Sequence, residues 1–380
     1  MKIFKTLLVM LVGALLTVSC GLSEENDSTD LQLEVSKSKI FNNGEDYAEF
    51  TVTLGGKVLT KGYEIWNAQT LTPANVVDNR FTSTMTGTFS FKAVYGTLQS
   101  NIVKVNVQLA PPSMTEPPVD NNPEKTNFYR RVLFTQFTGT GCGYCPYMTN
   151  AVAEARADAD TDAKMVFTAV HHFNSDDPSY FTGAVTLANV LGVGGSAPAV
   201  RADLTKVNNM GCGQSAKAVK NFVTTYYIKD TAKAGIAVNS KLYTAEKFVV
   251  CSALVKVNTD GEYRVGAWLL EDKVYGVQAN YDNLTPYGDV NFNYHNGSVR
   301  VADSRQGTEW TGVDLGTMKA GQAKSMDFAI QLDSDWKTED LYLVLFVSTK
   351  NDKGTWVVNN AIYAAAEGVT DFVYDDVVEE

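Results

Sequence analysis

The chain has 380 residues, 44% of them hydrophobic and 20% charged, an ordinary globular composition that allows two or three hydrophobic cores. Its formal net charge of -11 excludes a general nucleic-acid binder, because no excess of cations offsets phosphate repulsion. Five cysteines are too few for a scaffold built from disulfides, so their positions carry the information.

The first 20 residues predict an export signal that ends at a cysteine. Lys2 and Lys5 precede the apolar run 7–16, which is shorter than the roughly 20 residues of a membrane-spanning helix. Cys20 follows this run and resembles the acylated cysteine of a bacterial lipobox. The alternative is ordinary cleavage near Ser19, which would release a soluble protein. We expect the lipoprotein, because nothing else explains a lone cysteine there.

Residues 21–30 are polar and acidic, and they predict a flexible tether between the lipid anchor and the first domain. Acidic residues close behind Cys20 resemble the export tag of Bacteroidota surface lipoproteins. This resemblance implies an outer membrane lipoprotein, on the periplasmic side or at the cell surface. A lipid would then be the attachment to the membrane.

Residues 31–109 predict an immunoglobulin-like β-sandwich. Short alternating runs such as 48–54 and 87–95 are separated by Gly and Asn turns, which gives about seven strands in about 80 residues. The block contains no catalytic constellation and is interpreted as a spacer or binding module. Residues 110–127 hold five of the ten prolines and predict an extended linker.

Residues 128–234 alternate between strands and helices, which predicts an α/β domain. The expected strands are 131–137, 164–171 and 197–201, and the expected helices end near 158 or span 180–191 and 214–232. Residues 235–368 return to short alternating runs and predict a C-terminal β-sandwich, and 369–380 form an acidic tail. The expected fold class is therefore multidomain α+β.

Cys142 and Cys145 have the spacing of a redox-active disulfide at the start of a helix. The positive end of the helix dipole would lower the pKa of Cys142, the attacking thiolate, and Cys145 would resolve the mixed disulfide. An inert disulfide is one alternative. A zinc site with His171 and His172, which end the next strand, is another. Either histidine could instead be a proton shuttle or a structural residue.

Residues 137–146 resemble the active-site loop of thioredoxin-like proteins, and more narrowly the Bacteroidota outer-membrane-protein-twenty-eight family of lipoproteins. Tyr294-His295-Asn296 with Arg300 resembles a motif in the C-terminal part of that family. The resemblance covers roughly 127–367 and implies a central thioredoxin-like domain. It also implies a catalytic role for Pro198, at the place where thioredoxin folds keep a cis-proline facing the dithiol. Thioredoxins usually have Trp where this chain has Gly141.

Two functional hypotheses follow. The first is an exported, membrane-anchored thiol-disulfide oxidoreductase that uses Cys142 and Cys145, acts on protein thiols or disulfides, and needs no cofactor beyond its own disulfide. The second is a cell-surface binding or assembly lipoprotein in which the thioredoxin-like domain is a non-catalytic scaffold. The sequence indicates neither a nucleic-acid partner nor an oligomeric state.

Two further groups of residues allow alternatives. Cys212 and Cys251 either pair in an oxidising compartment, or Cys251 is a small buried hydrophobe. The C-terminal aromatic residues either bind glycans or fill the core, and the core is favoured because two of the tryptophans lie in apolar runs. These residues are Trp268, Trp310, Trp336, Trp356, Tyr281, Tyr287 and Tyr294.

Overall fold

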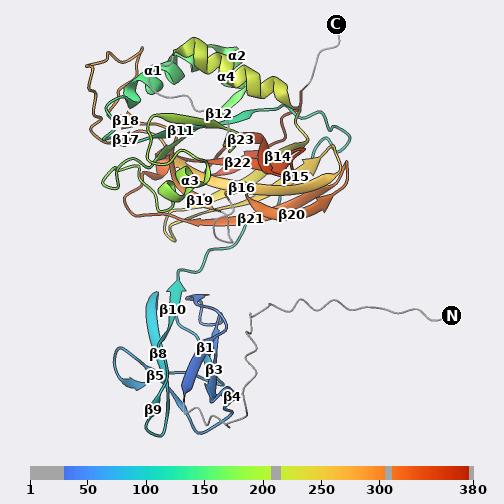
Figure 1. The fold of residues 1–380 in the computed structure, drawn as a ribbon. Coiled ribbons are helices and arrows are strands. Elements are labelled where there is room, and N and C mark those ends of the chain that lie inside the picture. Colours follow the sequence, from blue (N-terminus) through green and yellow to red (C-terminus); the bar gives the residue numbers. More distant parts are fainter. Residues whose placement is uncertain (1–29, 207–214, 304–309, 376–380) are drawn as a thin grey trace, which may run out of the picture. The chain divides into compact units, whose positions relative to one another are not determined.

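The computed structural model describes residues 30–206, 215–303 and 310–375. The chain divides into two units, Met1–Ala110 and Pro111–Glu380, and the division falls at the start of the proline-rich stretch. Each unit has hydrophobic clusters of its own, and each is described by itself (Figure 1).

Two sheets build the described part of the first unit. In one sheet β3 pairs with β1, β4 and β7, and the other has the order β2-β10-β8-β5-β6, with β9 paired to β8. Alternate residues of both sheets, such as Phe50 and Phe91, are buried in one cluster, because side chains in a strand alternate between its two faces. The strands are β1 Leu31–Val35, β2 Lys39–Phe41, β3 Ala48–Leu54, β4 Lys57–Val58, β5 Glu64–Asn67, β6 Thr72–Pro73, β7 Arg80–Phe81, β8 Gly87–Tyr95, β9 Leu98–Gln99 and β10 Val103–Gln108.

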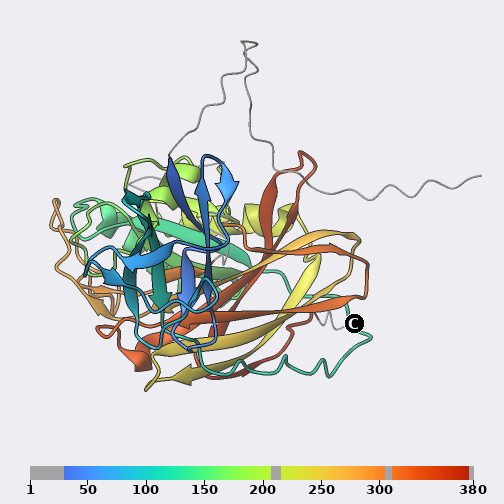
Figure 2. The same cartoon turned by 90° about the horizontal axis from the view of Figure 1, so that it is seen from below.

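Strands outnumber helices in the described part of the second unit, and many of the strands are long (Figure 2). The helices are α1 Cys145–Arg156, α2 Ala159–Ala163, α3 Ala184–Val190, α4 Ala216–Lys229 and the 3-10 turn η1 Thr338–Asp340. The strands are β11 Val132–Thr138, β12 Met165–His171, β13 Ala199–Ala202, β14 Ala234–Tyr243, β15 Phe248–Val257, β16 Gly261–Glu271, β17 Val274–Tyr275, β18 Tyr294–His295, β19 Ser298–Asp303, β20 Val313–Met318, β21 Ala323–Gln331, β22 Leu341–Lys350, β23 Trp356–Ala365 and β24 Gly368–Thr370.

One eight-stranded sheet runs through this unit in the order β13-β11-β12-β19-β16-β22-β23, with β20 paired to β16. β11 and β12 are parallel, and every residue of both strands is buried, as expected for strands covered on both faces. On one face Phe134 and Phe167 pack against α1 and α4, which lie together over the sheet (Figure 1). On the other face Leu133 and Val166 pack with α3 and with residues of β16 and β22.

A second sheet, β21-β15-β14-β24, covers part of the eight-stranded sheet. One hydrophobic cluster joins the two sheets, with Ile236 and Val255 on one side and Leu269 and Leu345 on the other. This is the expected C-terminal β-sandwich arrangement. Trp268 belongs to the core on the opposite face of the eight-stranded sheet, so the core interpretation is confirmed for this residue.

The expectation of a central thioredoxin-like α/β domain is wrong. No such domain is evident in the described residues, because β11, β12 and β13 are part of the same sheet as the C-terminal strands. The junction is the edge of β12, where Ala169 pairs with Ser298 of β19 and its N–H donates to the carbonyl oxygen of Gly297 at 2.7 Å. The second unit is therefore β-rich, and its helices cover only one end of a large mixed sheet.

Residues of the proline-rich stretch lie against the second unit. Lys256 of β15 is almost completely buried, and its Nζ contacts a carboxylate oxygen of Asp120 at 2.8 Å and the carbonyl oxygen of Pro123 at 2.6 Å. Thr115 donates to the carbonyl oxygen of Asn239 at 2.8 Å. Several contacts therefore fasten this part of the stretch to the sandwich.

Candidate functional site

The sequence places the two cysteines of the dithiol at the junction between β11 and α1. β11 ends at Thr138, a turn follows in which the N–H of Cys142 donates to the carbonyl oxygen of Gly139 at 3.0 Å, and Cys145 is the first residue of α1. The two cysteines form a disulfide with their Cα atoms 5.4 Å apart. Pro146 occupies the first turn of the helix, where a missing N–H costs nothing. Cys142 is 3% exposed and Cys145 is completely buried.

The strand register brings the other candidate residues of the sequence to the same end of the sheet. Ala199 pairs with Phe137 in the antiparallel β11–β13 ladder, so the cis Ala197-Pro198 bond lies beside the end of β11. His171 pairs with Thr138 in the parallel β11–β12 ladder. The expectation that the two histidines end a strand parallel to the first is therefore confirmed. No described residues form a cluster of three His, Cys, Asp or Glu side chains that could hold a metal ion.

A long loop covers the disulfide. Residues 276–293 connect β17 to β18, and we call them the cover loop. The N–H of Ala279 donates to the carbonyl oxygen of Thr140 at 2.8 Å, and the N–H of Tyr281 donates to that of Gly143 at 3.1 Å. Gln278 Nε2 donates to the carbonyl oxygen of Cys142 at 2.9 Å and lies 3.1 Å from that of Thr140. The turn that holds the disulfide is thus bonded along its length to the cover loop.

The cover loop also packs tightly on the residue between the two cysteines. A β-carbon added to Gly143 would lie 2.3 Å from Cγ of Tyr281, which is closer than any real contact. Tyr281 makes an edge-to-face contact with Tyr144, with the ring centroids 5.4 Å apart. Farther along α1, Asn150 donates to the carbonyl oxygen of Thr285 and accepts from the N–H of Tyr287, both at 2.8 Å. The cover loop therefore follows α1 for more than one turn.

Asp177 is the polar centre that joins the dithiol turn to the end of β12. Its Oδ2 accepts from the N–H of Thr140 at 2.6 Å and lies 2.8 Å from Nδ1 of His171, and its Oδ1 accepts from the N–H of Ser179 at 2.8 Å. Burial by itself would raise the pKa of Asp177, but these hydrogen bonds and the His171 ring lower it to about 2. The carboxylate is therefore ionised and fixes the orientation of His171.

Two more histidines lie near this centre. His295 of the cover-loop hairpin contacts His171 edge-to-face, with the ring centroids 4.8 Å apart, and its Nε2 donates to the carbonyl oxygen of Gly276 at 3.1 Å. Burial, with a smaller contribution from His171, lowers the pKa of His295 to about 4. His172 is buried with neither ring nitrogen hydrogen-bonded, and burial lowers its pKa. Both residues are therefore neutral at physiological pH.

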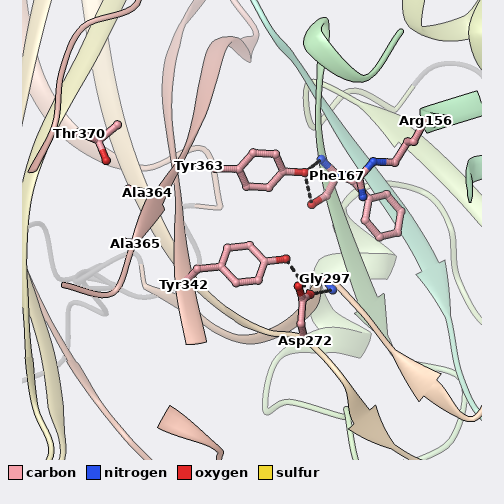
Figure 3. A pocket seen from close by; sticks show the side chains of 9 residues that line it. All are labelled: Arg156, Phe167, Asp272, Gly297, Tyr342, Tyr363, Ala364, Ala365 and Thr370. Carbon is pink, nitrogen blue, oxygen red and sulfur yellow. Dashed lines mark hydrogen bonds between the residues drawn. The ribbon is translucent and has the colours of Figure 1, made fainter. Parts of the chain in front are cut away.

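Two cavities adjoin this region and share Arg156 and Phe167 in their walls. One, of about 320 Å³, lies between α1, β11, β12 and the C-terminal part of the cover loop. The other, of about 400 Å³, is lined by Tyr342 and Tyr363 (Figure 3). Tyr363 accepts from the N–H of Phe167, and Tyr342 donates to Asp272 at 3.1 Å. Because their hydroxyl groups already have protein partners, the tyrosines of the second cavity are mainly structural.

The structure describes one of the three remaining cysteines. Cys20 and Cys212 lie outside the described residues, so lipidation of the former and pairing of the latter stay predictions. Cys251 is buried in the core of the sandwich. The expectations that Cys142, Cys145 and Pro198 act in catalysis also remain predictions.

Sequence reasoning missed the contacts between the cover loop and the turn that holds the disulfide. Gln278 and Tyr281 reach it from more than 130 positions away, and no local pattern announces that contact. One signal was available, because residues 276–293 are rich in Tyr and Asn, lack Lys and Arg, and lie between the two motifs that carried the family resemblance. No sequence motif marked Asp177 as a residue of the site.

The chain was compared with protein-family models and with known proteins, and it matches one family model in part and is similar to two solved structures. Residues 201–366 match the family model of the outer membrane protein Omp28, a range that includes the cover loop and excludes the disulfide. The solved structure of HBP35 of Porphyromonas gingivalis matches with a TM-score of 0.50 and 19% identity, covering 67% of this chain and 80% of that one. A protein of Agrobacterium tumefaciens gives a TM-score of 0.39 and 12% identity, covering 62% and 94%. No curated protein matches the chain significantly.

The match to an outer membrane protein family supports the expected location at the outer membrane. Among residues 30–206, 215–303 and 310–375, no helix has the length and apolar character needed to cross a membrane. At 19% identity, the likeness to HBP35 concerns the fold alone.

Proposed function

We propose that this protein is a binding or assembly protein of the outer membrane, and that its Cys142–Cys145 disulfide is a structural link. The burial of the disulfide carries the proposal, because Cys142 is 3% exposed and Cys145 is completely buried in a turn that is bonded to the cover loop. Exchange requires a thiolate to reach one of the two sulfur atoms, and buried disulfides are inert for that reason. The family match adds support for the location.

In this proposal the disulfide fixes the conformation of a turn to which the cover loop is hydrogen-bonded. Residues 140–143 present three carbonyl oxygens, those of Thr140, Cys142 and Gly143, to hydrogen-bond donors of the cover loop. A closed Cys142–Cys145 link limits the conformations of this turn and so favours the bonded arrangement. The loop in turn exposes two tyrosines, Tyr281 and Tyr287, which are suited to binding because they offer large contact areas at little entropic cost.

The proposal is tested by thiol trapping of the full chain in detergent. The folded protein is incubated with dithiothreitol, alkylated and analysed by mass spectrometry, beside a sample unfolded in guanidinium chloride. We expect the unfolded sample to be reduced quickly and the folded sample to keep its Cys142–Cys145 disulfide. Equally fast reduction of both samples would refute a structural role for the disulfide.

A thiol-disulfide oxidoreductase is the second candidate. The position of Cys145 at the first turn of α1 favours it, because the helix N-terminus stabilises a nearby thiolate. The Cys142 thiolate would attack a substrate disulfide, and Cys145 would release the reduced substrate as the protein disulfide closes. Because the cover loop blocks this attack, it would first have to open. Reduction of insulin by the wild-type protein and its loss in Cys142→Ser would support this candidate, and equal activity of the two would exclude it.

Attachment through a lipid on Cys20 is proposed together with the location. The test is metabolic labelling with a radioactive fatty acid, followed by detergent phase partitioning. We expect label in the wild-type protein and none in Cys20→Ala, which should also leave the membrane fraction. A labelled Cys20→Ala protein would contradict the anchor.

A further inference from the structure

Polar groups without protein partners face the 320 Å³ cavity beneath the cover loop. Gln136 of β11 is 3% exposed, lines the cavity, and makes no side-chain hydrogen bond to any described residue. His171 also lines the cavity and uses only Nδ1, toward Asp177. Its Nε2 makes no hydrogen bond to any described residue. The cavity thus offers an amide and an imidazole nitrogen that have no hydrogen-bond partner among the described residues.

The cations near the cavity are already neutralised. Arg156 lies 2.6 Å from a carboxylate oxygen of Asp162, and Lys273 lies 2.6 Å from one of Asp340. The cover loop itself contains two aspartates and no Lys or Arg. An anionic ligand would therefore meet no unpaired positive charge here. Asp289 also lines the cavity, and its carboxylate can accept from a hydroxyl group. The free hydrogen-bonding groups therefore favour a ligand that carries hydroxyl groups and no negative charge.

The walls and the rim of the cavity add apolar ring surface. Phe167 and Phe292 line it and are almost completely buried. Tyr294 also lines it but is 46% exposed, and its ring contacts that of exposed Tyr275 with centroids 5.5 Å apart. Flat aromatic rings pack against the C–H face of a pyranose, while its hydroxyls need donors and acceptors at the edge. The volume is at the lower end of about 300–1,000 Å³ for ligand sites, which suits one or two sugar rings.

We propose that this cavity binds the terminal one or two residues of an uncharged glycan. Sugar hydroxyls form hydrogen bonds with Nε2 of His171 and with the amide of Gln136, and a ring face packs on Phe167. Tyr294 contacts the part of the glycan that leaves the cavity. The proposal deepens the proposed binding function, on which it rests, because it names the class of ligand. It also assigns a binding role to Tyr294, one of the aromatic residues singled out in the sequence.

The test measures binding of neutral trisaccharides of glucose, mannose, galactose and N-acetylglucosamine to the full chain in detergent, by saturation-transfer NMR and calorimetry. Gln136→Leu removes the amide at similar volume, and Tyr294→Ala removes the ring at the rim. Phe41→Ala is the control, because Phe41 is also an exposed aromatic residue, at 40%, but does not line the cavity. Colominic acid, an anionic glycan, serves as the charged comparison.

We expect at least one neutral trisaccharide to bind, about tenfold more weakly to Gln136→Leu and several-fold more weakly to Tyr294→Ala, with Phe41→Ala unchanged. Absence of binding to the wild-type protein, binding only of the anionic glycan, or unchanged affinity in Tyr294→Ala would overturn the proposal. Tyr294 is exposed, so Tyr294→Ala should fold. The affinity of Tyr294→Ala therefore tests the proposal even if Gln136→Leu fails to fold. Thiol trapping of Cys142–Cys145 reports on the proposed function separately, so failure of one proposal is distinguishable from failure of the other.

Discussion

Replacing Gln278 should open the cover loop without removing the disulfide. Gln278→Met keeps the length of the side chain but loses the Nε2 hydrogen bonds to the carbonyl oxygens of Cys142 and Thr140. Each such bond contributes about 0.5–1.5 kcal/mol, so the closed loop loses about 1–3 kcal/mol. The open population then rises by about 5- to 150-fold. Because dithiothreitol reaches Cys142 only in the open form, the reduction rate should rise by the same factor.

The assay follows the mass of alkylated protein over time in dithiothreitol, at a temperature where circular dichroism shows the variant to be folded. Val277→Ala is the control, because Val277 lies in the same loop and is highly exposed. Its reduction rate should match that of the wild-type protein. If Gln278→Met is reduced no faster than Val277→Ala, the cover loop does not control access to the disulfide, and the reasoning fails.

Three further perturbations test the surroundings of the site. Gly143→Ala places a β-carbon against Tyr281, so the melting temperature should fall by an amount equivalent to about 1–3 kcal/mol; an unchanged melting temperature would show that the loop gives way freely. Arg300→Met leaves buried Glu271 without its ion pair and should cost about 3–5 kcal/mol in chemical unfolding, with an unaltered midpoint as the contrary result. His295 has its pKa lowered from 6.5 to about 4, so the unfolded state binds more protons between these values. Stability should fall by about 3 kcal/mol as pH drops from about 6.5 to about 4, and His295→Gln should flatten this dependence.

Local pattern predicted the elements of the second unit well. The expected strands 131–137 and 164–171 are β11 and β12 to within a residue or two, and the dithiol lies in the expected turn before a helix. Periodicity and turn residues are properties of short windows, so sequence carries them directly.

The pairing of these strands into one sheet could not be predicted from short stretches of sequence. Alternating strands and helices look the same whether their sheet ends at β12 or continues, and here it continues through Ala169 and Ser298 into the C-terminal strands. That pairing joins residues 129 positions apart, and nothing in the sequence around either residue marks its partner. The error in fold class has this single physical cause.

Some residues of the candidate site could likewise be predicted from local sequence, and others could not. Cys142, Cys145 and the neighbouring histidine were found because their chemistry depends on spacing along one strand–turn–helix. Gln278 was missed because its role depends on a loop crossing from the other half of the unit. Exposure of a disulfide is a tertiary property, and it is the property that separates a structural link from a redox centre.

A redox titration of the Cys142–Cys145 pair in the folded protein tests the central claim most directly. Samples of the full chain are equilibrated with dithiothreitol or glutathione buffers of graded potential, and the free thiols are then trapped. Structural disulfides have reduction potentials below about −300 mV, and we predict that this pair is still oxidised at the more positive potentials of the glutathione buffers. A midpoint near −200 mV, with the protein still folded, would contradict a structural disulfide and favour redox exchange.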